Sequence, residues 1–380
     1  MPDTLHRPTW AEVDLGCIRS NVAALRAQLQ PSSTLMAIVK ADAYGHGAVA
    51  VARATLEAGA THLGVAMVEE GVALRSAGVT APILVLGWTP IAEARMVMEA
   101  DLDQCIFDPS DATAFAAAGR ALGRRVRLHA KVDTGMGRIG LVARKEDDLD
   151  AVTAAIAAMA RTDGVELAGI FTHFASADAD DLTTAHAQLT MFQEVLAGLQ
   201  AMGIRPRWRH CANSAAILRL PESHLDLCRA GIALYGYPAS SAVPRAGLQP
   251  ALRWYTEVAQ VKSLRAGESV SYNATYTASR SEWVATLPVG YADGFPRRLS
   301  NVGRVLIGGV PHSVRGRVCM DQIVVSLDDG PLPQRGDHVV LIGEEQGSAQ
   351  WADDLAQQAG TIAYEVLCGI SRRVPRLYRG

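Results

Sequence analysis

Between residues 17 and 231, short apolar runs alternate with stretches that carry apolar residues at helical spacing. The clearest helical stretch is 182–201, in which apolar side chains recur every three or four residues. This recurrence predicts an amphipathic helix, whereas continuous apolar runs are typical of strands that are buried on both faces. Eight such runs are present, at 35–40, 62–66, 82–86, 104–107, 125–132, 166–174, 207–212 and 225–231.

Eight buried strands separated by helices predict a (β/α)8 barrel, with a doubly wound open sheet as the structural alternative. After Tyr235 the pattern changes, because residues 236–252 are rich in Pro, Gly, Ala and Ser, as domain boundaries often are. Beyond them, short strands alternate with turn residues until helical periodicity returns near 349–359 and 361–369.

The expected organisation is therefore an α/β chain of two domains. An N-terminal (β/α)8 barrel spans 12–240 and a C-terminal mostly-β domain spans 241–380. The first residues, about 1–11, are candidates for pairing with the second domain. A length of 380 residues agrees with two domains better than with one.

Composition excludes several classes of protein. Lys and Arg number 36 against 39 Asp and Glu, a formal net charge of −3, so nothing favours nucleic acid or an anionic membrane as a partner. No apolar stretch reaches the about 18 residues that span a bilayer. The N-terminus lacks the apolar core of a signal peptide, and a cytoplasmic location is expected. The six cysteines form no CxxC pair, so no metal site is expected.

Candidate chemistry follows the strand runs, at the end where barrel enzymes hold their active sites. Lys40 directly follows a buried strand, and the partial desolvation expected there suits a Schiff-base amine. Turn-forming residues on the same rim could bind a phosphate through backbone N–H groups. The candidates on this rim are Lys40, Lys131, Asp133, Arg138, His173, Asn213, Ser214, Arg229, Gly231 and Ile232.

Each of these residues also has a purely structural reading. A lysine is most often a solvated surface charge, His173 can be a satisfied barrel histidine, and Arg229 can be an ion-pair partner. The set is therefore more informative than any one member. Patterns of other chemistries, such as HExxH, GxSxG, the P-loop and the EF-hand, are absent from the sequence.

Nine segments resemble those of the bacterial alanine racemases, pyridoxal-phosphate enzymes of the barrel-plus-β-domain type. They follow the family's order along essentially the whole chain. The segments are AIVKADAYGHG (37–47), KVDTGMGRIG (131–140), THFASAD (172–178), HCANSAA (210–216), CRAGIALYG (228–236), VSYNATYTA (270–278), PVGYADGFPR (288–297), GRVCMDQ (316–322), and TIAYEVLC with RVPR (361–376).

The resemblance implies a two-base mechanism. Pyridoxal phosphate binds covalently to Lys40, and Lys40 and Tyr276 move the α-proton on opposite faces, Tyr276 reaching in from the second subunit. His173 matches the family's partner for that tyrosine. Arg229 matches an arginine at the pyridine nitrogen, where it cannot practically accept a proton and keeps the nitrogen unprotonated.

The resemblance also implies the remaining binding residues. Lys131 matches a lysine that can be carbamylated and then orients Arg138. The cofactor contacts are Lys40, Tyr44, Arg138, His173, Asn213, Ser214, Arg229, Gly231, Ile232 and Tyr364. The substrate contacts are Arg138, Tyr291, Met320 and Asp321.

We therefore expect an isomerase that interconverts L-alanine and D-alanine and supplies D-alanine for peptidoglycan, as a homodimer with shared active sites. A racemase of broader specificity, for example acting on serine, remains an alternative, because one hydroxyl discriminates only modestly. A decarboxylase of the same fold type places a glutamate at the pyridine nitrogen, and Arg229 argues against it. Tyr276 and the long C-terminal region argue against a non-catalytic, barrel-only cofactor-binding protein.

Overall fold

The chain divides into two compact units in a computed structural model that describes residues 7–327 and 331–380. Among the described residues, we call 17–43 and 48–249 the barrel unit, and 7–16, 44–47, 250–327 and 331–380 the β unit. Of the N-terminal residues expected to pair with the second domain, residues 1–6 lie outside the described part. None of the helices in that described part is long and apolar enough to cross a membrane.

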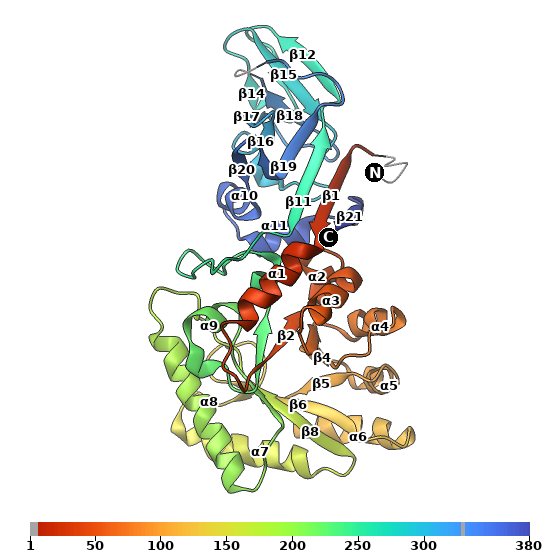
Figure 1. Cartoon of the computed structure of the whole chain (residues 1–380), viewed down its shortest axis with the longest axis vertical. Coiled ribbons are helices and arrows are strands. Elements are labelled where there is room, and N and C mark those ends of the chain that lie inside the picture. Colours follow the sequence, from red (N-terminus) through yellow and green to blue (C-terminus); the bar gives the residue numbers. More distant parts are fainter. Residues whose placement is uncertain (1–6, 328–330) are drawn as a thin grey trace. The chain divides into compact units, whose positions relative to one another are not determined.

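Eight parallel strands form the sheet of the barrel unit, in the order β10-β2-β3-β4-β5-β6-β8-β9. Figure 1 labels β2, β4, β5, β6 and β8 among them. Each of the eight strands overlaps one of the eight apolar runs. They are β2 (Thr34–Ile38), β3 (His62–Val65), β4 (Ile83–Val85), β5 (Asp103–Ile106), β6 (Val126–Asp133), β8 (Val165–Phe171), β9 (Trp208–His210) and β10 (Leu227–Ala230), with the short β7 (Leu141–Val142) beside β6.

Backbone hydrogen bonds also join the two ends of this strand order. The N–H of Asp226 donates to the carbonyl of Arg209 (3.1 Å), and the N–H of Arg229 donates to the carbonyl of Ala212 (3.0 Å). These bonds link the segments that carry β9 and β10, so the sheet closes on itself. The predicted (β/α)8 barrel is therefore confirmed over the open sheet.

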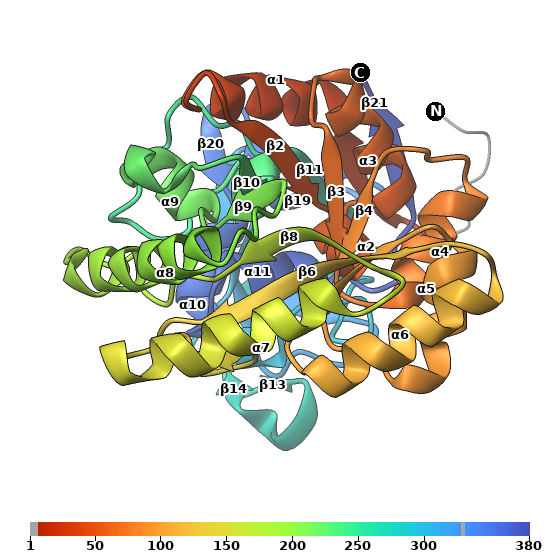
Figure 2. The same ribbon diagram turned by 90° about the horizontal axis from the view of Figure 1, so that it is seen from below.

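Helices surround the barrel strands, as the view in Figure 2 shows. The predicted helix 182–201 is α8, which buries Leu189, Phe192 and Leu199 against the barrel wall. The helices are α1 (Leu15–Arg26), α3 (Ala48–Glu57), α4 (Val68–Ser76), α5 (Ala94–Glu99), α6 (Pro109–Ala121), α7 (Leu149–Arg161), α8 (Thr183–Ala201) and α9 (Ser214–Arg219), and a further turn, α2 (Lys40–Tyr44), is left-handed.

The β unit is built on one large sheet, in the order β12-β15-β18-β17-β16-β19-β11-β1-β21, which confirms a mostly-β second domain. The N-terminal strand β1 pairs antiparallel with β11 and parallel with β21. The strands are β1 (Thr9–Asp14), β11 (Leu252–Glu257), β12 (Gln260–Leu264), β15 (Glu282–Leu287), β16 (Arg304–Ile307), β17 (Val310–Arg315), β18 (Ile323–Ser326), β19 (His338–Glu345), β20 (Ser348–Gln350) and β21 (Arg376–Arg379).

Two smaller features complete the β unit. The strands β13 (Ser269–Val270) and β14 (Tyr276–Thr277) form a separate two-stranded ladder. The helices α10 (Ala352–Ala359) and α11 (Ala363–Gly369) correspond to the two expected near the C-terminus. A buried cluster of Leu264, Val270, Ala278 and Val284 packs β13 and β14 against the large sheet.

Candidate active site

Lys40 lies two residues after the end of strand β2 and opens a left-handed turn. The next three residues have φ of 52°, 52° and 54°, a conformation that costs an L residue roughly 1–2 kcal/mol. Two carboxylates hold this turn: Glu70 Oε1 accepts from the N–H of Ala41 (2.6 Å), and Asp42 Oδ1 accepts from the N–H of Ala48 (2.8 Å). The lysine is thus presented at the carboxyl end of a barrel strand by a tightly held backbone.

The guanidinium of Arg229 is enclosed in the barrel, with 4% of the residue exposed. Its Nη1 donates to Nδ1 and to the carbonyl of His210, both at 3.0 Å, and its Nη2 donates to the carbonyl of Thr172 at 2.8 Å. Its Nε–H makes no hydrogen bond to any described residue, so one donor is left for an added acceptor. Burial lowers the pKa of Arg229 to about 10, and the group stays charged at neutral pH.

A chain of buried polar groups leads from Arg229 across the barrel. Because arginine only donates, Nδ1 of His210 accepts, and the proton of its neutral ring lies on Nε2. Burial lowers the pKa of His210 well below its usual value, so the ring is neutral. Its Nε2 lies 2.9 Å from Nδ1 of His129, and Nε2 of His129 lies 3.4 Å from Asp103 Oδ2. The carboxylate at the start of β5 therefore ends a chain that begins at the guanidinium.

Neither His129 nor His210 was predicted as a site residue. Both stand inside apolar strand runs, where a histidine reads as an ordinary core residue. The signal that could have found them is that a histidine inside a buried strand needs a polar partner. In a closed barrel, that partner comes from another strand.

His173, two residues after the end of β8, contacts the same guanidinium. Its Nδ1 accepts from Nη2 of Arg229 at 3.2 Å, so the proton of the neutral ring lies on Nε2. Desolvation lowers the pKa of His173 well below its usual value, and the positive charges of Arg229, Lys131, Arg138 and Lys40 lower it further. The residue therefore offers a neutral imidazole with one N–H to donate.

Lys131 is buried in β6, with 5% of the residue exposed and its Nζ 4.4 Å from the ring centroid of Phe171. Burial, and then the charge of Arg229, lowers its pKa to about 7. A large share of Lys131 is therefore a neutral, nucleophilic amine at neutral pH.

The loop that carries the exposed Arg138 is anchored by Asp133. Oδ1 of this buried carboxylate accepts from the N–H groups of Gly135 and Gly137, both at 3.0 Å. Gly140 adopts φ +131°, and a Cβ there would lie 2.7 Å from the backbone nitrogen of Asp133. The glycine is therefore required for the close approach that closes the loop.

Ser214 lies against the backbone that follows β10. The N–H of Gly231 donates to Ser214 Oγ at 2.8 Å, which leaves the serine proton free to be donated. Asn213 caps α9, because its Oδ1 accepts from the N–H of Ala216 at 3.0 Å. Ile232 follows at the start of a 3-10 helix. A hydroxyl beside a sharply turned backbone suits a phosphate.

The remaining predicted residues lie in the β unit. The rings of Tyr44 and Tyr364 are 5.8 Å apart between centroids, and burial raises the pKa of Tyr44. The hydroxyl of Tyr276 donates to Glu282, with its oxygen 2.7 and 2.9 Å from the two carboxylate oxygens. The guanidinium carbon of Arg315 lies 4.8 Å from the Tyr276 ring centroid.

Tyr291 and Met320 are both exposed, at 43% and 52%, and lie on adjoining loops. The N–H of Tyr291 donates to the carbonyl of Cys319 (3.0 Å), and the N–H of Ala292 donates to the carbonyl of Met320 (3.0 Å). Asp321, next along the chain, lines a cavity of about 480 Å³ with Met320.

The predicted residues thus form two groups, one in each unit. The barrel unit brings together Lys40, Lys131, Arg138, His173, Asn213, Ser214, Arg229, Gly231 and Ile232 at the carboxyl ends of its strands. The β unit carries Tyr44, Tyr276, Tyr291, Met320, Asp321 and Tyr364. Glu282, which sequence reasoning did not single out, belongs to the second group through its bond to Tyr276.

Comparisons with known proteins match both units. Residues 13–239 match the family described as "Alanine racemase, N-terminal domain", and residues 251–378 match "Alanine racemase, C-terminal domain". The alanine racemase of Symbiobacterium thermophilum is 51% identical over 376 residues, 98% of each chain. That of Desulfovibrio desulfuricans is 45% identical over 373 residues, again 98% of each chain.

Solved structures agree with the sequence matches. The structure of alanine racemase from Clostridium difficile 630 has a TM-score of 0.93 at 36% identity, covering 99% of this chain and 97% of that one. The structure of alanine racemase from Streptomyces lavendulae has a TM-score of 0.92 at 42% identity, covering 98% and 97%.

Proposed function

The chain belongs to the alanine racemase family, and we propose that Lys40 and Tyr276 are the two bases with which it interconverts L-alanine and D-alanine. Members of this family are isomerases that depend on pyridoxal phosphate, and the resemblance first seen in nine sequence segments is confirmed in both domains. The roles of individual residues are our proposal and rest on the geometry of each unit.

The main structural support for the proposal is the buried Arg229. Its unused Nε–H suits the ring nitrogen of pyridoxal phosphate, which accepts a hydrogen bond when it is unprotonated. A guanidinium that stays charged donates this hydrogen bond but does not transfer its proton, so the ring nitrogen stays unprotonated. The His210 ring and the Thr172 carbonyl hold the guanidinium in one orientation. A decarboxylase of this fold type would need a carboxylate in this place.

The residues present fit the whole cofactor. Ser214 supplies a hydroxyl donor beside the turned backbone of Gly231 for the phosphate, and Lys40 supplies the amine for the aldehyde carbon. When bound, pyridoxal phosphate withdraws electrons from the α-carbon of the amino acid. We assign the binding of this group to Lys40, Tyr44, Arg138, His173, Asn213, Ser214, Arg229, Gly231, Ile232 and Tyr364.

Racemisation needs one proton acceptor and one donor on opposite faces of the α-carbon. In this proposal the Lys40 amine serves one face, and the Tyr276 hydroxyl of the partner subunit serves the other. A free tyrosine is a weak base near neutrality. His173, held neutral with a proton on Nε2, offers the hydrogen bond that stabilises the tyrosine oxygen when its proton has left.

The substrate carboxylate is assigned to Arg138, Met320 and Asp321, with Tyr291 narrowing the entrance. Burial, the charge of Arg229 and the charge of Arg138 lower the pKa of Lys131 to about 7, and this lysine is therefore a candidate for carbamylation. The carbamate would place a negative charge near Arg138, where the amine is partly neutral and partly positive.

A homodimer with shared active sites follows from the same assignment. Tyr291 and Met320 expose large apolar side chains on adjoining loops, a feature that marks contact surfaces. In a symmetric dimer each subunit would contribute these loops and Tyr276 to the active site of its partner.

A cytoplasmic location and a supply of D-alanine for peptidoglycan complete the proposal. The six cysteines are free thiols, the state that a reducing compartment maintains.

Chiral chromatography of L-alanine after incubation with the purified protein and pyridoxal phosphate tests the function. Conversion toward equal amounts of both enantiomers, with L-serine nearly untouched in a parallel reaction, is expected. Equal conversion of serine would favour the broader racemase. No conversion of either amino acid by the cofactor-loaded protein would overturn the assignment of the two bases.

A further inference from the structure

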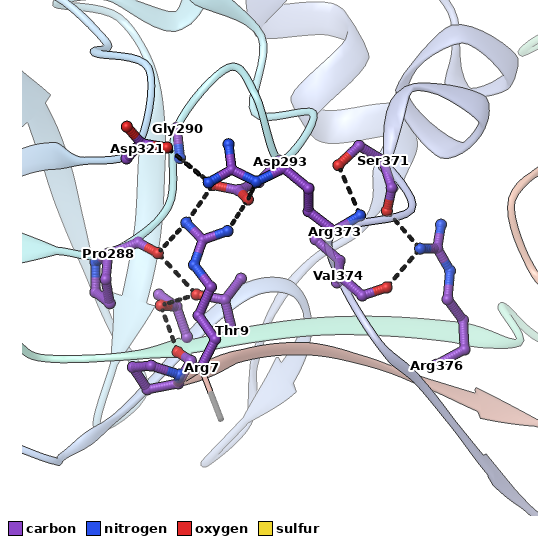
Figure 3. Close-up of polar contacts among 12 residues, drawn as sticks. Arg7, Thr9, Pro288, Gly290, Asp293, Asp321, Ser371, Arg373, Val374 and Arg376 are labelled. Atoms are coloured by element: carbon purple, nitrogen blue, oxygen red, sulfur yellow. Dashed lines mark hydrogen bonds and ion pairs between the residues drawn. The ribbon is translucent and has the colours of Figure 1, made fainter. Parts of the chain in front are cut away.

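A fully buried carboxylate, Asp293, stands in the turn that carries Tyr291 (Figure 3). Arg7 from the N-terminal segment binds it with both Nη atoms, and its Nη2 donates to Oδ2 at 2.7 Å. The N–H of Gly290 donates to the same oxygen at 2.9 Å. Arg7 also donates to the carbonyl of Pro288 at 3.1 Å. The Asp293 carboxylate and Arg7 therefore link the turn to the N-terminal segment and to the chain just before the turn.

A second arginine links Asp293 to the neighbouring loop. Nε of Arg373 lies 3.8 Å from Asp293 Oδ1, and its Nη2 donates to Asp321 Oδ1 at 2.8 Å. Arg373 thereby bridges one buried and one exposed carboxylate. Asp293 also accepts, through its backbone carbonyl, the N–H of Ser371 at 2.9 Å. The segment 371–373 is thus joined to the turn through the backbone of Ser371 and through the side chain of Arg373, which Figure 3 shows.

The turn and the loop of residues 319–321 touch through their backbones. A Cβ on Gly290 would lie 2.4 Å from the carbonyl oxygens of both Cys319 and Met320. Gly294 has φ +105°, and a Cβ there would lie 2.2 Å from the carbonyl oxygen of Gly369. No side chain fits at either contact, so a shift of the turn moves its neighbours with it.

We propose that Asp293 is the positioning residue of the substrate entrance: with Arg7 and Arg373 it fixes Tyr291 relative to Met320 and Asp321. The inference rests on the proposed function, which places those three residues at the substrate. A two-pronged arginine–carboxylate pair is directional, so it sets geometry more strongly than an apolar contact of the same size. Asp293 itself touches neither substrate nor cofactor in this assignment.

Asp293→Asn tests the inference, because the amide oxygen keeps the bond to Gly290 while the charge is removed. We expect KM for alanine to rise on the order of tenfold in both directions, with a smaller change in kcat. Backbone amide exchange is expected to accelerate in residues 290–294 and 319–321. Absorbance of the bound cofactor should not change, since other elements hold it.

Glu12→Gln is the matched control. It weakens another arginine–carboxylate pair of the β unit, in which Arg379 binds Glu12 across β1 and β21. A lower thermal midpoint without a change in KM is expected. If Asp293→Asn behaves in the same way, Asp293 is merely structural and the inference fails.

Arg373→Gln gives a second route if the buried substitution prevents folding. Arg373 is 47% exposed in its side chain, and the variant cuts the link between Asp293 and Asp321. It should raise KM, and Arg373→Lys should recover part of the loss. Failure of the wild type to racemise alanine would overturn the proposed function alone. Amide exchange of both loops would then still decide whether Asp293 positions them.

Discussion

Nδ1 of His210 lies 3.0 Å from Nη1 of Arg229, and this contact fixes where the protons of the barrel core lie. The ring of His210 must accept on that side, so a second proton on it would face a cation. Phe171 stacks on the same ring, with 4.8 Å between centroids and 4° between planes. His210 is therefore held neutral by burial and by the neighbouring positive charge. Because the folded chain cannot protonate this ring, acid should lower the stability of the fold.

Acid should destabilise the fold through its buried histidines. The pKa values of His210 and His173 lie well below the usual 6.5, and burial lowers that of His62 to about 4. Below pH 6.5 these histidines are therefore protonated in the unfolded chain but not in the native chain. Each of them lowers the free energy of unfolding by at most about 1.4 kcal/mol per pH unit. This stability is fully present above pH 6.5 and is lost as the pH falls toward 4.

Urea unfolding of wild type and His62→Gln checks this prediction. Between about pH 7 and about pH 5, the free energy of unfolding should fall by about 2 kcal/mol less in the variant than in the wild type. His186→Gln, which changes a histidine that is 54% exposed in its side chain, should follow the wild type. Parallel stability curves for wild type and His62→Gln would contradict the assignment.

Tyr276→Phe should separate proton exchange from racemisation. Lys40 can still remove and return the α-proton on its own face, so one enantiomer should exchange that proton with deuterated solvent. Racemisation should fall on the order of a thousandfold, since the second face has no base. Mass spectrometry of each enantiomer, separated on a chiral column, measures both. Equal loss of exchange for the two enantiomers would remove Tyr276 as a face-specific base.

Two inactive variants should restore each other if the site is shared between subunits. In a dimer of Lys40→Ala and Tyr276→Phe chains, one site has both substitutions and the other has neither. About half of the wild-type activity per dimer is therefore expected in purified mixed dimers. Mixed dimers of Lys40→Ala with wild type supply the reference. No recovery in verified mixed dimers would place both bases on one chain.

Lys131 should react with carbon dioxide. Its pKa of about 7 leaves much of the amine neutral, so nitrogen can bond to the carbon of CO₂ and release one proton. Labelled bicarbonate should give a carbamate signal by nuclear magnetic resonance that Lys131→Met lacks and the exposed Lys145→Met retains. We expect kcat/KM of Lys131→Met to fall on the order of tenfold, through poorer placement of Arg138. Equal spectra for wild type and Lys131→Met would contradict the prediction.

The barrel could be predicted because its strands are buried on both faces. Most of the eight therefore stand out as apolar runs in the sequence, whereas β9 is Trp-Arg-His and is only partly buried. Strand β17 is harder to predict, since it contains Pro311 and buries His312 between that proline and Ser313. Strand β21 is Arg-Leu-Tyr-Arg and carries no period-two pattern of its own. Its place beside β1 depends on pairing between residues more than 350 apart in the chain.

The candidate site divides along the same line. Lys40, His173 and Arg229 could be predicted because the ends of buried strands select them before any family is considered. His129 and His210 could not, since their bond joins strands that are 81 residues apart. Asp293 and Arg7 are separated by 286 residues, and neither segment alone indicates a partner. Buried polar pairs between residues far apart in the sequence thus cannot be predicted from local sequence patterns.

The backbone next to Lys40 has the handedness opposite to the one that L residues favour. Ala41 and Ala43 hold φ near +52° and +54°, where Cβ of an L residue crowds the following carbonyl oxygen. For a D residue the same angles are the mirror image of the ordinary right-handed helix. D-alanine, the compound that the reaction forms, would thus fit positions 41 and 43 of the chain with less strain than the L-alanine that occupies them.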